Sequence, residues 1–144
     1  MELRPEIVDL PPGDPRLPRA WDVMTELRPH RSHDDMDALY GEAAQFGYQV
    51  TALFEGAGCR AVAGWRFGVN FHLGRNLYVE DLVTAADARS TGHGAALIEH
   101  LRGVARDAGC AALHLDSGVQ RHDAHRFYFR EGMHISSHHF LQLL

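Results

Sequence analysis

The distribution of proline is the feature that most restricts how this chain can fold. All six prolines lie between Pro5 and Pro29, and residues 30–144 contain none. Because proline fixes its own φ and has no amide donor, it ends helices and interrupts strands. We therefore expect short elements in the N-terminal part and long, uninterrupted elements in the rest of the chain.

Hydrophobic periodicity predicts elements in the order β-α-α-β-β-β-α-β-α-β. Strands dominate the middle of the chain and helices separate them, which indicates an α+β fold, or a layered α/β fold. The length fits a single domain spanning residues 1–144. The expected strands are 6–10, 48–54, 59–67, 76–84, 111–115 and 133–143, and the expected helices are 14–27, 32–47, 92–108 and 121–131.

Composition excludes several classes of function. The net charge of -5, with no basic footprint, argues against a nucleic-acid partner. No stretch approaches the ~18 apolar residues of a membrane span, and the acidic N-terminus lacks the apolar core of a signal peptide. Cys59 and Cys110 have no metal or redox spacing. We expect a cytoplasmic protein with reduced cysteines and no metal.

The segment between Asp81 and Gly94 connects an expected strand to an expected helix, and it carries the pattern Arg-x-x-Gly-x-Gly. Glycines in the first turn of a helix let a ligand approach the backbone without a Cβ in the way. The first helical amides have no internal partner and point outward with the positive end of the dipole. The segment therefore predicts a site for a diphosphate, although a plain glycine-rich turn would have the same glycines.

Three separated pieces of the chain together carry a family resemblance. The segment 80–84 reads EDLVT, the segment 89–94 reads RSTGHG, and the segment 124–133 reads AHRFYFREGM. In this order and near this spacing they resemble the GNAT superfamily of N-acetyltransferases. Arg121 and His125 resemble the subset with an Arg-x-x-Ala-His-x-Phe-Tyr helix motif. The resemblance covers about residues 76–135.

This resemblance implies a fold and an activity. The fold would be a mixed sheet of six to seven strands with helices on both faces. Two splayed parallel strands, 76–84 and 111–115, would hold acetyl-CoA between them. The activity would be N-acetyltransfer to a primary amine of a small molecule or peptide, by direct attack in a ternary complex. The alternative is a non-catalytic module on the same fold that binds or senses CoA.

The resemblance also implies roles for individual residues. Tyr128 would be the general acid for the leaving thiolate, although an aromatic residue on an apolar helix face also fits a core position. Glu80 would be the base, and Asp81 is its rival because adjacent strand residues face opposite ways. The expected cofactor-binding residues are Leu82, Val83, Thr84, Arg89, Ser90, Thr91, Gly92, His93, Gly94 and Arg121.

The sequence does not identify the amine that would accept the acetyl group. Charge complementarity suggests acidic residues around a cationic amine. A cluster of C-terminal histidines offers a proton shuttle or simple packing, and no metal-ligand motif accompanies it. A homodimer is a further expectation from the family. The candidate residues of the acceptor pocket are Trp21, Asp34, Asp35, Phe71 and His72.

Overall fold

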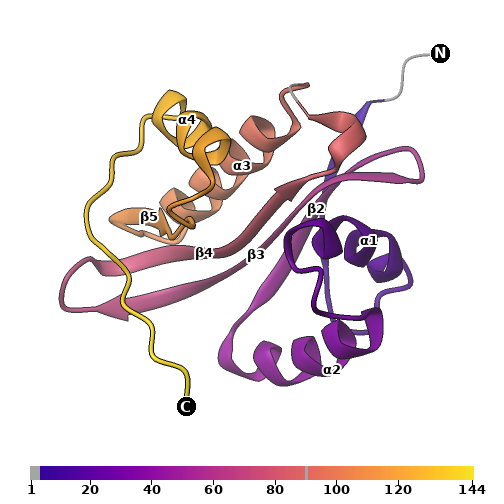
Figure 1. The fold of residues 1–144 in the computed structure, drawn as a ribbon, viewed down its shortest axis with the longest axis horizontal. Helices are drawn as coiled ribbons and strands as arrows, with labels where there is room; N and C mark the ends of the chain where they lie inside the picture. Colours follow the sequence, from indigo (N-terminus) through magenta and orange to yellow (C-terminus); the bar gives the residue numbers. More distant parts are fainter. Residues whose placement is uncertain (1–3, 90) are drawn as a thin grey trace. The chain divides into compact units, whose positions relative to one another are not determined.

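The computed structural model describes residues 4–89 and 91–144. The chain divides into two compact units, Met1–His114 and Leu115–Leu144. The first unit contains a sheet with α-helices, and the second contains one α-helix followed by an extended segment (Figure 1). The element order agrees with the order predicted from the sequence as far as the last helix.

The sheet orders its strands as they occur in the sequence, and five strands are found among the described residues. The first four pair antiparallel in succession. The fifth follows the fourth through a helical crossover, which is the connection that parallel neighbours require. The mixed α+β fold is therefore confirmed, whereas the expected six to seven strands are not. The strands are β1 (Pro5–Leu10), β2 (Gln49–Glu55), β3 (Gly58–Asn70), β4 (Gly74–Thr84) and β5 (Ala112–Leu115).

Helices α1 (Leu17–Leu27) and α2 (His33–Ala43) cover one face of the sheet (Figure 1). The start of α2 follows from its sequence, because Ser32 Oγ accepts from Asp35 N at 3.0 Å and Asp35 Oδ2 accepts from Ser32 N at 3.1 Å. This reciprocal pair is a capping box. The apolar core on this face includes Trp21, Met24, Met36, Tyr40, Val50, Ala52, Val62 and Val83.

Helix α3 (His93–Asp107) lies on the opposite side of the sheet in Figure 1. Leu97, Ile98 and Leu101 of α3 are completely buried, and so is Leu77 of β4. Because successive strand residues point to opposite faces, the alternating apolar residues of β3 and β4 supply both cores. The sheet is thus the middle of three layers, and β4 passes directly toward the start of α3 through the short 3-10 helix η2 (Ala86–Ala88).

The second unit contains helix α4 (His122–Arg130), close to its predicted range. The expected strand over residues 133–143 is wrong, since residues 133–144 have no regular secondary structure. Apolar side chains at Ile135, Phe140, Leu141 and Leu143 produced the strand-like pattern, and all four are exposed. A strand needs a hydrogen-bonded neighbour as well as an apolar pattern, and none of the sheet's five strands comes from this segment.

Candidate functional site

A β-bulge in β4 places two carboxylates at one point of the sheet. The register pairs Gly64 with Asp81 and Trp65 with Val79, so that Glu80 is the extra residue of β4. A bulge breaks the simple alternation of side chains and is common next to active sites. The sequence pattern assumed an unbroken strand and therefore could not decide which of Glu80 and Asp81 faces an open space.

The carboxylate of Asp81 is fully engaged by neighbouring side chains. Its Oδ2 accepts from the Tyr48 hydroxyl at 2.8 Å, and its Oδ1 accepts from Arg28 Nε at 2.9 Å. The Asp81 side chain is 17% exposed. Burial, and next the negative charge of Asp81, raise the pKa of Tyr48 well above its usual value. Tyr48 therefore stays protonated and keeps donating to Asp81, which makes Asp81 an anchored acceptor.

Tyr48 reaches Asp81 because β3 has a glycine at the bulge. A Cβ on Gly64 would overlap the Tyr48 hydroxyl and Cζ, and would lie 2.8 Å from Cε2. Glycine inside a strand often marks a bulge or a close approach, and this signal was present in the sequence. Gly64, Tyr48 and Arg28 belong to the surroundings of the two carboxylates, and sequence reasoning missed them because their convergence depends on the bulged register.

Glu80 is in a more open environment than Asp81. Its side chain is 37% exposed, and Arg66 Nε lies 3.4 Å from Glu80 Oε1, which is long for a hydrogen bond. The Arg66 guanidinium also lies over the Tyr78 ring, 5.3 Å from its centroid. The backbone oxygen of Glu80 accepts from Arg28 Nη2 at 3.3 Å. Glu80 thus has a fixed main chain and a carboxylate that an incoming group can reach.

After the bulge, the outer edge of β4 extends beyond the short strand β5. The backbone of Ala111 donates to Arg75 O at 2.8 Å, and β5 is only four residues long. A parallel β5 of this length runs beside the first half of β4 and ends near residue 79, at a rise of about 3.3 Å per residue. Leu82, Val83 and Thr84 pair with β3 on their inner edge. No strand among the described residues covers the outer edge of these three residues.

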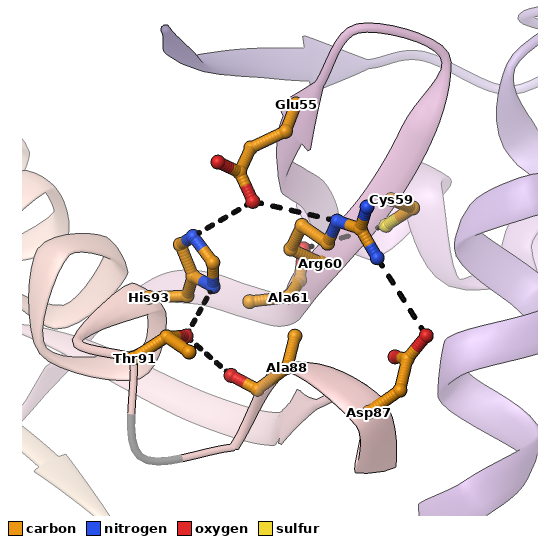
Figure 2. A network of polar contacts seen from close by, with 8 residues as sticks. All are labelled: Glu55, Cys59, Arg60, Ala61, Asp87, Ala88, Thr91 and His93. Atoms are coloured by element: carbon orange, nitrogen blue, oxygen red, sulfur yellow. Dashed lines mark hydrogen bonds and ion pairs between the residues drawn. The ribbon is translucent and has the colours of Figure 1, made fainter. Parts of the chain in front are cut away.

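The turn from β4 to α3 has the geometry expected of an anion site. Gly92 has φ +86° as the N-cap of α3, and a Cβ there would meet nothing within 4 Å. As glycine, it offers no side chain to the first amides of α3. The Thr91 hydroxyl donates to Ala88 O, and Thr91 Oγ1 lies 2.6 Å from His93 Nδ1 (Figure 2). Arg89 precedes this turn in an extended conformation, and Ser90 lies outside the described residues.

The predicted residues Arg121 and Tyr128 belong to the second unit. Arg121 is the N-cap of α4, and Tyr128 lies near the end of α4, where its carbonyl accepts from Met133 N at 3.0 Å. Burial raises the pKa of Tyr128, partly offset by the positive charge of Arg121. His125 Nε2 bonds Gly118 O at 2.8 Å, which ties the start of α4 to the preceding loop.

The predicted acceptor residues have other roles in the structure. Trp21 is buried in the core, where its indole NH donates to Asp37 at 2.8 Å. Asp35 caps α2. Phe71 and His72 lie in the exposed β3–β4 turn. Asp34 lies in the first turn of α2, next to Asp35.

Cys59 is a buried cysteine of β3. Burial raises the pKa of the Cys59 thiol to about 12, so this cysteine is protonated and unreactive at neutral pH. Within residues 4–89 and 91–144, no three His, Cys, Asp or Glu side chains gather in a metal-binding arrangement. In the same ranges, no helix has both the length and the apolar character needed to cross a bilayer.

Comparison with known proteins gives consistent similarities. The model of the acetyltransferase (GNAT) family matches residues 17–133. The uncharacterized N-acetyltransferase YhdJ of Bacillus subtilis (strain 168) is 37% identical over 110 residues, which are 76% of this chain and 78% of that protein. The aminoglycoside N-acetyltransferase AAC(6')-Iy, solved with CoA, has a TM-score of 0.88 at 12% identity over 100% of this chain and 97% of that chain. Glucosamine-6-phosphate N-acetyltransferase of Arabidopsis thaliana has a TM-score of 0.76 at 18% identity, covering 97% of this chain and 98% of that chain.

Proposed function

Since the chain belongs to the GNAT family and is an acyltransferase, we propose that it transfers the acetyl group of acetyl-CoA to a primary amine of a small molecule. The amine would attack directly while both substrates are bound. The observation that carries this proposal is the bulge at Glu80. It sets an accessible carboxylate in β4, just before Leu82–Thr84 and twelve positions before Gly92, the N-cap of α3.

The start of α3 supports the binding of a diphosphate. The first amides of a helix have no internal acceptors, and the helix dipole adds positive potential there. The glycine N-cap leaves these amides uncovered. We propose that the amides of Ser90 through Gly94 hold the pyrophosphate, with the Arg89 and Arg121 guanidiniums compensating its charge. The backbone of Leu82, Val83 and Thr84 would pair with the pantetheine arm, which can use the outer edge of β4.

Glu80 is the preferred base because Asp81 is already occupied. Each carboxylate oxygen of Asp81 accepts a hydrogen bond, from Arg28 and Tyr48, so proton uptake there would remove the negative charge that strengthens both contacts. Glu80 can accept the proton of the ammonium directly or through one water. The neutral amine then attacks the thioester carbon, and collapse of the tetrahedral intermediate breaks the C–S bond. Tyr128 would protonate the leaving thiolate and would regain a proton from the nitrogen of the intermediate, which must lose one to become the amide. Its raised pKa keeps the Tyr128 hydroxyl protonated at neutral pH before this transfer.

The acceptor is proposed only as a class. AAC(6')-Iy acts on aminoglycosides and the Arabidopsis thaliana enzyme on glucosamine-6-phosphate, according to their names. Both acceptors carry amines on small polar frameworks. We propose an acceptor of this general kind. Lysine side chains and peptide N-termini are the second class of amine to be tested. The homodimer implied by family resemblance is tested by light scattering of the purified chain.

The experiment compares wild type with Glu80→Gln and Tyr128→Phe on one amine that the wild type acetylates. Removal of a general base or acid costs about 10²–10⁴ in rate. We expect kcat to fall by about this amount in Glu80→Gln while the calorimetric Kd for CoA stays unchanged. Full activity of Glu80→Gln would refute the assignment of Glu80. CoA binding by the wild type without transfer to any amine would support the non-catalytic alternative.

A further inference from the structure

A network of polar side chains connects the end of β2 to the first turn of α3 (Figure 2). Glu55 is the last residue of β2, and its Oε1 lies 3.1 Å from His93 Nε2 and 3.4 Å from Arg60 Nε. His93 Nδ1 lies 2.6 Å from Thr91 Oγ1. Arg60 Nη1 also lies 3.7 Å from Asp87 of η2. The network therefore reaches residues on both sides of the turn that precedes α3.

Counting protons in this network defines the state of His93. The Thr91 hydroxyl has one proton, and it is donated to Ala88 O. Thr91 Oγ1 must then accept from His93 Nδ1–H. The Glu55 carboxylate, beside Arg60, accepts at Oε1 and needs a proton on His93 Nε2. Both ring nitrogens donate, so the Glu55–His93 pair holds one proton more than a carboxylate and a neutral imidazole would.

Loss of this proton would change the contacts of the turn. The Nε2 lone pair would face the Glu55 carboxylate, or the Nδ1 lone pair would face the Thr91 oxygen, and either contact is repulsive. The His93 side chain is only 11% exposed, so water cannot easily take the place of either partner. The groups that face His93 directly are Glu55 from β2 and Thr91 from the turn. Behind Glu55 lies Arg60 of β3, which also pairs with Asp87 of η2. The N-terminal dipole of α3 opposes a cation here, and Glu55 compensates for it.

We propose that Glu55 and His93 are positioning residues for the pyrophosphate turn, and that their shared proton couples the binding of the acetyl-CoA diphosphate to pH. The pair acts through Thr91, since both His93 nitrogens are already engaged and cannot bind phosphate themselves. A bound anion stabilises the protonated pair, and the protonated pair holds the turn in its binding geometry. Affinity for the diphosphate is therefore high at low pH and falls as pH rises and the pair loses its proton. The inference rests on the proposed function, because it assumes that the turn binds CoA.

The test measures binding of 3′-dephospho-CoA and of pantetheine by calorimetry at a series of pH values between about pH 6 and pH 9. Dephospho-CoA keeps the diphosphate but lacks the 3′-phosphate, whose own titration would confuse the profile. Pantetheine lacks the diphosphate altogether. The variants are Glu55→Gln and His93→Gln. Glu99→Gln is the matched control, because Glu99 is also paired with arginine but lies on the exposed side of α3.

We expect wild type and Glu99→Gln to lose affinity for dephospho-CoA as pH rises. Glu55→Gln and His93→Gln should bind it about tenfold more weakly at low pH, the loss of one charge-assisted hydrogen bond, and with little pH dependence. The double variant should be no weaker than His93→Gln alone, because the two residues act as one unit. Affinity for pantetheine should be unchanged in all variants.

Three results would overturn the inference while the wild type still binds dephospho-CoA. These are an unchanged Kd in both variants, an equal loss for pantetheine, and a wild-type affinity independent of pH. If Glu55→Gln fails to fold, His93→Gln and the wild-type pH profile still decide the matter. Absence of any binding to wild type would instead contradict the proposed function itself.

Discussion

Substitution of Gly64 by alanine tests the geometry that separates Glu80 from Asp81. The new Cβ would overlap the Tyr48 hydroxyl, so the ring must move away from Asp81. Overpacking of a tight core position costs about 1–3 kcal/mol. Loss of the hydrogen bond from Tyr48 to a charged carboxylate costs about 1.5–3 kcal/mol. The higher strand preference of alanine recovers about 0.5–1 kcal/mol. We therefore expect Gly64→Ala to lower the free energy of unfolding by about 3 kcal/mol.

Thermal and urea unfolding measure this loss, which corresponds to a fall in Tm on the order of 10 °C for a chain of this length. Gly58→Ala in the same strand is the matched control. Its Cβ would meet the flexible Arg60 side chain at 3.4 Å, an ordinary contact, and its cost should be under about 1 kcal/mol. The double variant Gly64→Ala/Tyr48→Ala should be less unstable than the sum of the single variants. Equal stability of Gly64→Ala and Gly58→Ala would refute the reasoning.

Three further predictions follow from the same unit. Gly92→Ala should weaken CoA binding several-fold, because a residue with a side chain pays about 1–2 kcal/mol to adopt φ +86°. Gly103→Ala is the control, since a Cβ there also meets open space but lies inside α3, and it should leave CoA binding unchanged. Calorimetry measures the Kd of both variants. Asp81→Asn should lower the free energy of unfolding, measured by urea titration, by about 1.5–3 kcal/mol, because Arg28 and Tyr48 lose their charged acceptor. An unaltered urea midpoint would count against an anchoring role for Asp81. The buried Cys59 thiol has its pKa raised to about 12, so the folded state keeps a proton that the unfolded chain releases above about pH 9. Stability should fall as pH rises from there toward about 12, and Cys59→Ala should flatten that fall in urea titrations; an identical slope in the variant would contradict this.

Most of the fold could be predicted from local signals. The capping box at Ser32 and the uninterrupted apolar periodicity of α3 act over a few residues, and both elements lie close to their predicted positions. The strand expected after residue 132 failed because apolar alternation does not provide a partner strand. The β3–β4 hairpin is also longer than expected, since β3 continues to Asn70 and β4 begins at Gly74, whereas the predicted strands end at 67 and begin at 76.

The candidate site was only partly accessible from the sequence. The glycine turn before α3 is a contiguous motif and could be predicted directly. The choice between Glu80 and Asp81 could not, because it depends on a bulge opposite Gly64 and on Tyr48 and Arg28, which lie 33 and 53 positions from Asp81. The role of Glu55 was invisible for the same reason, since its contact with His93 exists only once β2 and α3 are packed in the fold.

The most direct test of the central claim is acetyl transfer itself. Purified wild type is incubated with acetyl-CoA and a panel of small-molecule amines, amino sugars and lysine peptides, and the products are identified by mass spectrometry. The account predicts an N-acetylated small-molecule amine, formed with stoichiometric release of CoA and abolished or greatly slowed in Glu80→Gln. Transfer to no amine by a folded protein that binds CoA, or equal transfer by wild type and Glu80→Gln, would contradict it.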